Sequence, residues 1–426
     1  MIVLKIGGTS VVNTDFMLKI TDRMQREEET FIVVLSALSQ ITNTLDAMYK
    51  STEIEKTKKL INKFTDIHED YIHKLFSDIK EIKRAKKIVK DTLLQVERVI
   101  KREQYDLLMA LGEYLASSLY SLFLKSKNVK HSLKNSPDFI KIDASRKPNT
   151  KFIKLKCEQT KWQKINIFQG FICSDSDNNI TNLSRGGSDF TATLLGEAVR
   201  AKVIEIWSDM DGIRSNDPRF VSKTNCVSQL HYVEAAELAF FGAKILHPES
   251  VLPAQRVNIP MILKNSKNIN HSGTIINNEQ NKIGLKAIAA KDEIILINIT
   301  SYRMLMIHGF LSKIFDVFNT YKTSVDLITT SEVSVSLTID DATYLNQILK
   351  QLKTFSQVEV KNKMAIISVV GNLTNDRKQI AAKILNTISN PIEIISYGTN
   401  RRSISVLVEQ ENKNKNLNEL NILTYN

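Results

Sequence analysis

The chain contains little glycine, proline or cysteine for its length. Its 426 residues include 14 glycines, 7 prolines and 3 cysteines, whereas average usage of ~7% would give about 30 glycines. This composition excludes a collagen-like chain, a Gly/Ser linker and a proline-rich disordered protein. The three cysteines are widely spaced and form no CxxC pair, so the sequence predicts neither a disulfide framework nor a zinc ribbon. It fits a protein of a reducing compartment.

Long hydrophobic runs are also missing. Stretches such as FIVVL at 31–35 are far shorter than the ~20 apolar residues that span a bilayer. At the start of the chain, Lys5 follows only four apolar residues, which argues against a secretory signal peptide. We therefore expect a cytoplasmic protein without a membrane partner.

The net charge of +12 is concentrated in one stretch of the chain. Residues 125–164 contain 12 lysines and arginines against three acidic residues. This stretch lacks interleaved aromatic residues and any nucleic-acid fold signature. We interpret it as a solvated basic surface and expect no nucleic-acid partner; a patch that binds polyanions is the alternative.

The first residues have the pattern of a strand, a glycine turn and a helix. IVLKI at 2–6 is typical of a buried strand, and Gly-Gly-Thr-Ser at 7–10 follows it. Thr14 is the predicted cap of a helix, and FIVVLSA at 31–37 is a second predicted strand. A strand–helix–strand unit of this kind predicts a parallel sheet and an α/β fold.

The remaining pattern divides near residue 285. Before it, residues 51–124 predict two or three long helices, in which Gly112 is either a break or a site of close packing. After it, two β-α-β-β segments follow each other, which predicts small α+β units with antiparallel sheets. The predicted elements are strands at 165–168, 203–207, 260–264, 294–299, 324–328, 333–339, 364–370, 392–396 and 403–408, helices at 190–201, 311–320, 342–353 and 376–388, and a loop-rich stretch at 218–260.

Two glycine pairs stand beside charged residues suited to phosphate or carboxylate. In LKIGGTS at 4–10, backbone N–H groups can cradle phosphate oxygens and Lys5 can supply a point charge. In LSRGGSDF at 183–190, Arg185 can hold a carboxylate or phosphate by two hydrogen bonds. Asp189 can orient a metal-bound phosphate or a substrate amine. Taken singly, the first cluster could be an ordinary turn and the second a turn with a surface salt bridge.

A third cluster, IWSDMDGIRSNDPRF at 206–220, follows a predicted strand. Ser208 and Asp209 end that strand, where open α/β sheets bind ligands. Together with Asp209, the nearby Asp211 and Asp217 could suggest a calcium loop. The glycine position and terminal glutamate of an EF-hand are missing, so we reject that interpretation.

These clusters together resemble the amino-acid kinase fold and, within it, the aspartate kinases. The order of the motifs along the chain also matches that family. The further matching segments are VVLSA at 33–37 with Thr42 after it, Gly112-Glu113, QGFI at 169–172, ELAFFGAKILHPES at 237–250, NIPMILKN at 258–265 and SGTII at 272–276. VDLITTSEVSVSLTID at 325–340 and ISYGTNRRSISVLV at 395–408 resemble the family's paired ACT regulatory domains.

The resemblance implies a three-layer α/β catalytic domain with a mainly parallel sheet over residues 1–285. It implies a regulatory region over 286–426 with two ferredoxin-like α+β ACT domains. Their approximate ranges are 301–363 and 364–426, with a strand at 290–300 shared between them. ACT pairs of this kind imply a homodimer or a tetramer.

The implied activity is transfer of the γ-phosphoryl group of MgATP to the side-chain carboxylate of L-aspartate. By similarity, Lys5, Gly7 and Gly8 neutralise the transferring group, and Asp189 organises the site around Lys5. The implied substrate contacts are Ser36, Thr42, Glu113 and Arg185, and the implied nucleotide contacts are Ser208, Asp209, Arg214, Arg219 and Lys244. No residue is predicted as a protein ligand of a metal, and His247 is expected to be a structural hydrogen-bonding residue.

The segment VDLITTSE resembles the lysine-inhibited branch of the family and implies L-lysine as an effector. The implied effector contacts are Met304, Ser324, Val325, Asp326, Thr330, Ser331 and Glu332. Ile307 stands where lysine-inhibited relatives tend to carry serine, so the identity of the effector stays open.

Other functions remain as alternatives. The chain could be an amino-acid kinase for glutamate, N-acetylglutamate or a nucleotide, although the tandem ACT tail argues against this. A regulatory subunit without activity would be expected to lack Lys5, Arg185 or Asp189, and the chain has all three. Among the implied nucleotide contacts, Arg219 could instead only hold Asp217 in place, as a bracing contact.

Overall fold

The computed structural model describes residues 1–183, 186–242, 246–279, 283–301, 308–373, 377–398 and 401–425. The chain forms two compact units that exchange segments between residues 214 and 244. The predicted domain ranges, 1–285 and 286–426, divide the chain only once and stay predictions. The first unit comprises Met1–Ile213, Ser228–Ala236 and Ile245–Glu279, and the second comprises Arg214–Val227, Glu237–Lys244 and Gln280–Asn426.

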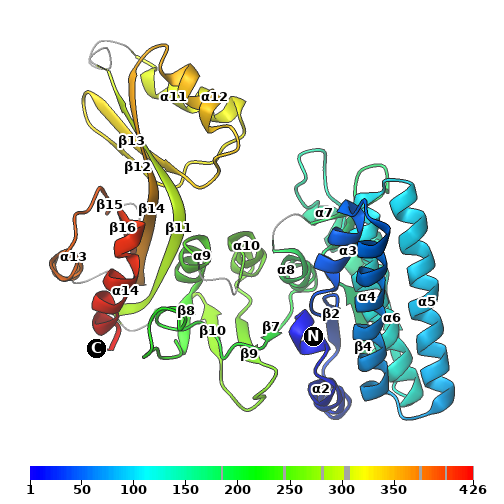
Figure 1. Cartoon of the computed structure of the whole chain (residues 1–426). Coiled ribbons are helices and arrows are strands. Elements are labelled where there is room, and N and C mark those ends of the chain that lie inside the picture. The colour runs from blue at the N-terminus through cyan, green and yellow to red at the C-terminus, as the bar shows by residue number, and fades with distance from the viewer. Residues whose placement is uncertain are drawn as a thin grey trace. The chain divides into compact units, whose positions relative to one another are not determined.

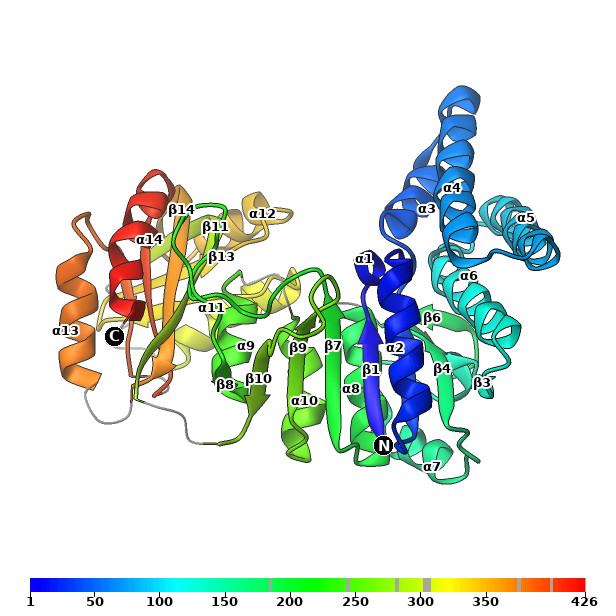
Figure 2. The same cartoon turned by 90° about the horizontal axis from the view of Figure 1, so that it is seen from below.

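The first unit is built on an eight-stranded sheet. Its strands are β1 (Ile2–Ile6), β2 (Phe31–Leu35), β3 (His131–Leu133), β4 (Ile165–Gln169), β7 (Val203–Ser208), β8 (Gln229–His231), β9 (Met261–Asn265) and β10 (Thr274–Asn277). The strand order is β3-β4-β2-β1-β7-β9-β10-β8, and much of it can be followed in Figure 2. All of these pairings are parallel except that of β9 with β10. The residues of β2 and β4 are buried throughout, as expected for a parallel sheet covered on both faces.

Helices cover this sheet, and a small hairpin of β5 (Ile172–Ser174) and β6 (Ile180–Asn182) lies apart from it. Three long helices fill the stretch 51–124, in agreement with the predicted two or three (Figure 1). The helices up to residue 256 are α1 (Gly8–Val11), α2 (Thr14–Arg26), α3 (Ile41–Lys50), α4 (Ile54–Leu75), α5 (Ile79–Lys101), α6 (Tyr105–Ser126), the 3₁₀ helix η1 (Ser136–Asp138), α7 (Thr150–Glu158), α8 (Gly187–Val199), α9 (Tyr232–Phe240) and α10 (Pro248–Arg256).

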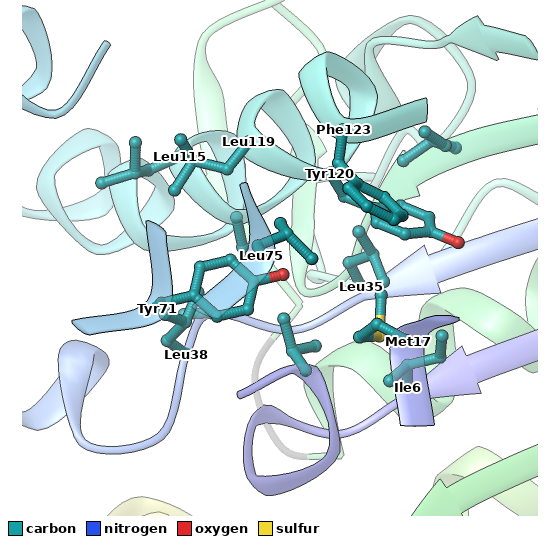
Figure 3. Close-up of a cluster of buried hydrophobic side chains, with 14 of the residues drawn as sticks. Ile6, Met17, Leu35, Leu38, Tyr71, Leu75, Leu115, Leu119, Tyr120 and Phe123 are labelled. Atoms are coloured by element: carbon teal, nitrogen blue, oxygen red, sulfur yellow. The ribbon is translucent and has the colours of Figure 1, made fainter. Parts of the chain in front are cut away.

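Helix α6 lies in the main hydrophobic core of the first unit. Figure 3 shows its Leu115, Leu119 and Phe123 beside Tyr71 of α4 and Leu35 of β2. By length and composition α6 could cross a membrane, but 78% of its most apolar window is buried inside the structure. Glu113 and several serines interrupt the apolar sequence of α6, so the helix contains no long unbroken apolar run. We interpret α6 as a core helix.

His68 of α4 is buried in the same region, and its protonation should limit stability in acid. Its Nδ1 lies 2.7 Å from the Phe64 carbonyl, and burial lowers the pKa of His68 from 6.5 to about 4. The unfolded chain therefore takes up a proton below pH 6.5 that the folded chain excludes until about pH 4. Stability should fall over that range by up to about 3 kcal/mol, at about 1.4 kcal/mol per unit of pKa difference.

The measurement is the free energy of unfolding in urea at pH 7 and at pH 4.5. His68→Gln should reduce the difference between the two values, whereas His73→Gln, at an exposed position of the same helix, should not. An unchanged pH dependence in His68→Gln would contradict the assignment.

The second unit has a six-stranded antiparallel sheet. Its strands are β11 (Gly284–Thr300), β12 (Ile328–Thr330), β13 (Ser334–Ile339), β14 (Gln357–Asn372), β15 (Ile394–Ser396) and β16 (Ser403–Glu409), in the order β12-β13-β11-β14-β16-β15. The two long strands β11 and β14 pair along most of their length. They connect the two β-α-β-β segments into one sheet.

Two separate hydrophobic cores lie in this unit, one for each segment. The helices are α11 (Phe310–Thr320), α12 (Leu345–Leu352), α13 (Arg377–Thr387) and α14 (Lys413–Asn421), with 3₁₀ helices η3 (Gln410–Asn412) and η4 (Ile422–Tyr425). Residues of α11 and α12 share one core with β11 and β13, and residues of α13 and α14 share the other with β14 and β16. The predicted fold class, α/β followed by tandem α+β units, is confirmed.

Several local predictions were wrong. The cap of α2 is Asn13, whose side chain accepts the Phe16 N–H, and not Thr14. The strand predicted at 324–328 begins later and is shorter, since β12 covers only Ile328–Thr330. Just before β12, the Leu327 N–H donates to the side-chain hydroxyl of Thr338. Helix α14 was not predicted.

The stretch 218–260 is less loop-rich than predicted, since it contains α9 and α10. Pro248 starts α10 at a position where a missing N–H costs nothing. Pro248 therefore marks the start of a helix in this stretch, and Pro253 lies inside the same helix.

Candidate functional site

Lys5 and Asp189 form an ion pair at the carboxyl end of β1. The Lys5 Nζ lies 2.8 Å from the Asp189 Oδ1, and both side chains are mostly buried. Lys5 is near the end of β1, and Asp189 is in the first turn of α8, where the helix dipole favours a negative charge. The structure thus brings together two predicted site residues that are 184 positions apart in the chain.

The two glycines after β1 differ in what surrounds them. The Gly7 N–H donates to the Trp207 carbonyl at 3.0 Å, so in this structure it does not point to a phosphate as predicted. A Cβ on Gly8 would lie 2.5 Å from the Ala37 carbonyl oxygen, which only glycine avoids. Gly8 is therefore required for the close approach of α1 to the chain after β2.

A cavity of about 350 Å³ opens beside Gly8. Three predicted substrate residues line it, Ser36, Thr42 and Glu113. The other lining residues, which were not named individually as predicted contacts, are Ala37, Leu38, Ser39, Gln40, Asn43, Phe171, Gly187 and Ser188. Since Gly187 and Ser188 immediately precede Asp189, the cavity adjoins the Lys5–Asp189 pair along the chain.

Glu113 reaches this cavity from α6 because Gly112 lets the helix pack closely. A Cβ on Gly112 would lie 2.8 Å from the Ala37 Cβ. Glu113 is 4% exposed, and burial raises its pKa to about 8, opposed by hydrogen bonds from the backbone of Ala37 and of Glu113 itself. A protonated carboxyl in this setting is poised to ionise when a cation arrives.

Two residues of the cavity wall have a left-handed backbone that is rare outside glycine. Gln40 has φ of 71° and Phe171 has φ of 70°. The Phe171 N–H donates to the Thr191 hydroxyl at 2.9 Å, and a Cβ on Gly187 would lie 2.7 Å from the Phe171 ring. Strained backbone held by its surroundings is typical of functional sites. No sequence signal indicated these conformations.

The predicted nucleotide residues fall into both units. In the first unit, the Ser208 hydroxyl accepts the Met210 N–H, and the Thr9 hydroxyl lies 3.4 Å from the Asp209 Oδ1. In the second unit, Arg214 donates to the hydroxyl and carbonyl oxygens of Thr224.

Arg219, also in the second unit, makes several hydrogen bonds to the carboxylate of Asp217. That is the bracing contact which the sequence left as an alternative. Arg185, Lys244 and Met304 lie outside the residues that the structure describes.

One predicted effector residue, Asp326, belongs to a charged cluster in the second unit. The Lys291 Nζ lies 2.9 Å from the Asp326 Oδ1 and 2.8 Å from the Asp340 Oδ2, and 4.8 Å from the centroid of the Phe240 ring. Burial raises the pKa of Asp326, and Lys291 opposes that rise. Of the other predicted contacts, Val325 packs against the hydrophobic core of this segment, and Ser324, Thr330, Ser331 and Glu332 are exposed.

His247 has a structural hydrogen bond. Its Nδ1 accepts the Glu249 N–H at the start of α10, in line with the expected role. Within the described ranges, no group of three or more His, Cys, Asp and Glu side chains gathers as a metal-ion site.

Comparisons with known proteins match both parts of the chain. The profile of the amino acid kinase family matches residues 1–265, and that of the ACT domain matches residues 367–421. The chain is 30% identical to the Lysine-sensitive aspartokinase 3 of Escherichia coli over 96% of each chain. It is 30% identical to the chloroplastic Aspartokinase 3 of Arabidopsis thaliana over 96% of this chain and 79% of that one.

Among solved structures, E. coli aspartokinase III in complex with aspartate and ADP matches over 100% of both chains, with a TM-score of 0.87 and 29% identity. The same enzyme in complex with lysine and aspartate matches over the same extent, with a TM-score of 0.76.

Proposed function

The chain belongs to the aspartate kinases of the amino acid kinase family, and on that premise we propose how its residues carry out and regulate the reaction. The γ-phosphoryl group of ATP, bound as its magnesium complex, passes to the side-chain carboxylate of L-aspartate and gives 4-phospho-L-aspartate. This is the first step toward lysine and diaminopimelate, threonine and methionine. The observation that carries the proposal is the Lys5–Asp189 pair beside a cavity lined by Glu113.

The cavity is suited to the aspartate molecule. Glu113 takes the α-ammonium group, Arg185 the α-carboxylate, and the hydroxyls of Ser36 and Thr42 hold the remaining oxygens. The E. coli relative solved with aspartate and ADP supports a substrate of this kind. A carboxylate nucleophile is already ionised at neutral pH, so the reaction needs no general base.

The charged groups at the end of β1 act on the phosphoryl group. Phosphoryl transfer depends on positioning and on neutralising negative charge. The Lys5 ammonium, held by Asp189, supplies that charge, and we propose that the Gly8 N–H assists it. Ser208, Asp209, Arg214 and Lys244 contact the nucleotide, and Arg219 does so with its guanidinium held by Asp217. The magnesium ion arrives with ATP as part of the substrate.

Glu113 should release a proton when aspartate binds. The empty site holds Glu113 protonated at pH 7, since its pKa is about 8, and an ammonium beside it favours the carboxylate. Calorimetry at pH 7 in buffers of different ionisation enthalpy should show close to one proton released per aspartate. Glu113→Gln should remove that release and raise the aspartate KM roughly 30-fold, because a buried charge partner is lost.

The control for Glu113 is Glu234→Gln, which changes another buried glutamate and should alter neither the proton release nor the aspartate KM. Proton release that persists in Glu113→Gln would assign the titration to another group.

Feedback inhibition by L-lysine completes the proposal. The Oδ1 atom of Asp326 forms an ion pair with Lys291. Its buried Oδ2 atom has no hydrogen-bond partner among the described residues. That oxygen can accept an effector ammonium, and we assign the remaining effector contacts to Met304, Ser324, Val325, Thr330, Ser331 and Glu332. The E. coli relative solved with lysine and aspartate supports this choice of effector.

The regulatory proposal is tested by aspartate-dependent ADP formation with and without lysine or threonine. Millimolar lysine should inhibit turnover and raise the melting temperature. If lysine does neither, the ACT pair serves another effector or only assembly.

The proposal also includes an oligomeric state and a cellular compartment. We place the enzyme in the cytoplasm as a homodimer or tetramer that forms through its ACT domains. The three cysteines are free, which agrees with a reducing compartment.

A further inference from the structure

Three serines connect the segments that end strands β7 and β9 with helix α1. The Ser10 hydroxyl of α1 donates to the Ser266 hydroxyl at 2.8 Å. The Ser266 hydroxyl donates in turn to the Ser208 carbonyl at 2.9 Å, and the Ser266 N–H donates to the same carbonyl at 2.7 Å. We call this chain of hydrogen bonds the serine bridge.

The serine bridge is buried. Ser10 is 0% exposed and Ser266 is 4% exposed. A buried hydroxyl without a partner is costly, and here each donates to a defined acceptor in another segment. The bonds therefore fix the separation of three segments that are distant in sequence.

Along the chain, a contact at Gly7 and the serine bridge at Ser10 flank Gly8. Gly7 connects the turn to β7 through its hydrogen bond to Trp207, and Ser10 connects α1 to the residue just after β9. Strands β1, β7 and β9 are neighbours in the sheet, and Figure 2 shows α1 beyond the end of β1. The turn that carries Gly8 is thus held at both ends.

Side chains beside the bridge belong to the predicted nucleotide site. Ser208 is followed by Asp209, whose carboxylate lies 3.4 Å from the Thr9 hydroxyl and 3.9 Å from the Lys267 Nζ. Any shift of Ser10 or Ser266 would move these groups relative to Lys5.

We propose that Ser10 and Ser266 are positioning residues for the nucleotide. They touch neither phosphate nor base; they hold the Gly7–Gly8 turn and the Ser208–Asp209 turn at the distance that the polyphosphate of ATP requires. This inference rests on the proposed function and deepens it. It assigns Ser10 and Ser266 to nucleotide binding and not to aspartate binding around Glu113.

The test compares Ser266→Ala with Ser174→Ala in the full-length chain. Ser174 is an equally buried serine whose hydroxyl donates to the Pro137 carbonyl at 2.8 Å, and it lies in the hairpin of β5 and β6. Calorimetry gives the dissociation constant of MgADP without aspartate, and steady-state kinetics gives KM for each substrate. Thermal melting measures how much each substitution destabilises the fold.

Ser266→Ala should weaken MgADP binding and raise the ATP KM about five-fold or more, as expected for the loss of one to two hydrogen bonds. The aspartate KM should stay within two-fold. Ser174→Ala should lower the melting temperature to a similar extent and change neither nucleotide constant. A Ser266→Ala variant that melts earlier but binds MgADP like the wild type would overturn the proposal.

Ser10→Ala gives a second test should Ser266→Ala fail to fold, because it keeps the bond from Ser266 to Ser208. It should weaken MgADP binding about two-fold or more, and unchanged binding would also overturn the proposal. If the wild type bound MgADP but turned over no aspartate, the proposed function alone would fail, since the binding comparison still decides the role of the bridge.

Discussion

Replacing Lys5 with methionine is expected to lower kcat for aspartate phosphorylation about 1,000-fold, as when a single charge-stabilising donor is removed from an active site. Lys5 lies near the carboxyl end of β1, and its ammonium is held 2.8 Å from the Asp189 carboxylate. Methionine keeps most of the apolar stem but removes the charge that neutralises the transferring phosphoryl group. The coupled ADP assay measures the effect.

The control is Lys202→Met, which removes an exposed lysine paired with Glu29 in the same unit. It should leave kcat within two-fold of the wild type. Lys5→Met should also destabilise the fold by about 1–3 kcal/mol, because the mostly buried Asp189 loses its partner. Adding Asp189→Asn should recover that stability without recovering activity. Near-wild-type turnover in Lys5→Met would refute the assignment of Lys5 to phosphoryl transfer.

Replacing Asp189 with asparagine is expected to lower kcat about 100-fold, the loss that a displacement of about 1 Å can cause in a reacting group. Asparagine has nearly the same shape but no charge, so it does not hold the Lys5 ammonium in place. Most of the effect should appear in kcat, because the aspartate contacts at Glu113 and Thr42 are unchanged.

The matched control for Asp189→Asn is Asp15→Asn, since Asp15 is also in the first turn of a helix. It tests whether loss of a favourable charge at a helix start is enough to reduce activity. If both variants lost activity equally, Asp189 would have no special role in the reaction. The proposed site predicts that only Asp189→Asn loses activity.

Some elements could be predicted because local sequence decides them. The strand Ile2–Ile6 was predicted to the residue, since five apolar or stem-burying side chains before a glycine pair admit few other structures. The long helices of 51–124 likewise follow from their periodicity. Gly112 was left open between a break and a packing site, and the structure decides for packing, because α6 continues through it.

The prediction of the site residues depended on the resemblance to the family more than on local sequence patterns. No spacing rule joins Lys5 to Asp189 across 184 residues, and only the family motifs brought the two together before the structure did. The left-handed backbones of Gln40 and Phe171 carry no sequence signal, because their neighbours impose them. The role of Ser266 could not be predicted from the sequence either, because its two hydrogen-bond partners lie in β7 and α1, far from it in the chain.

The most direct test of the account is formation of an acyl phosphate from aspartate. Purified chain is incubated with MgATP, L-aspartate and hydroxylamine, which traps an acyl phosphate as the hydroxamate, and ADP is measured in parallel. The account predicts equal amounts of ADP and aspartyl hydroxamate in the wild type, and both formed about 1,000-fold more slowly in Lys5→Met. ADP formed at the same rate without aspartate, or ADP formed without hydroxamate, would contradict transfer to the side-chain carboxylate.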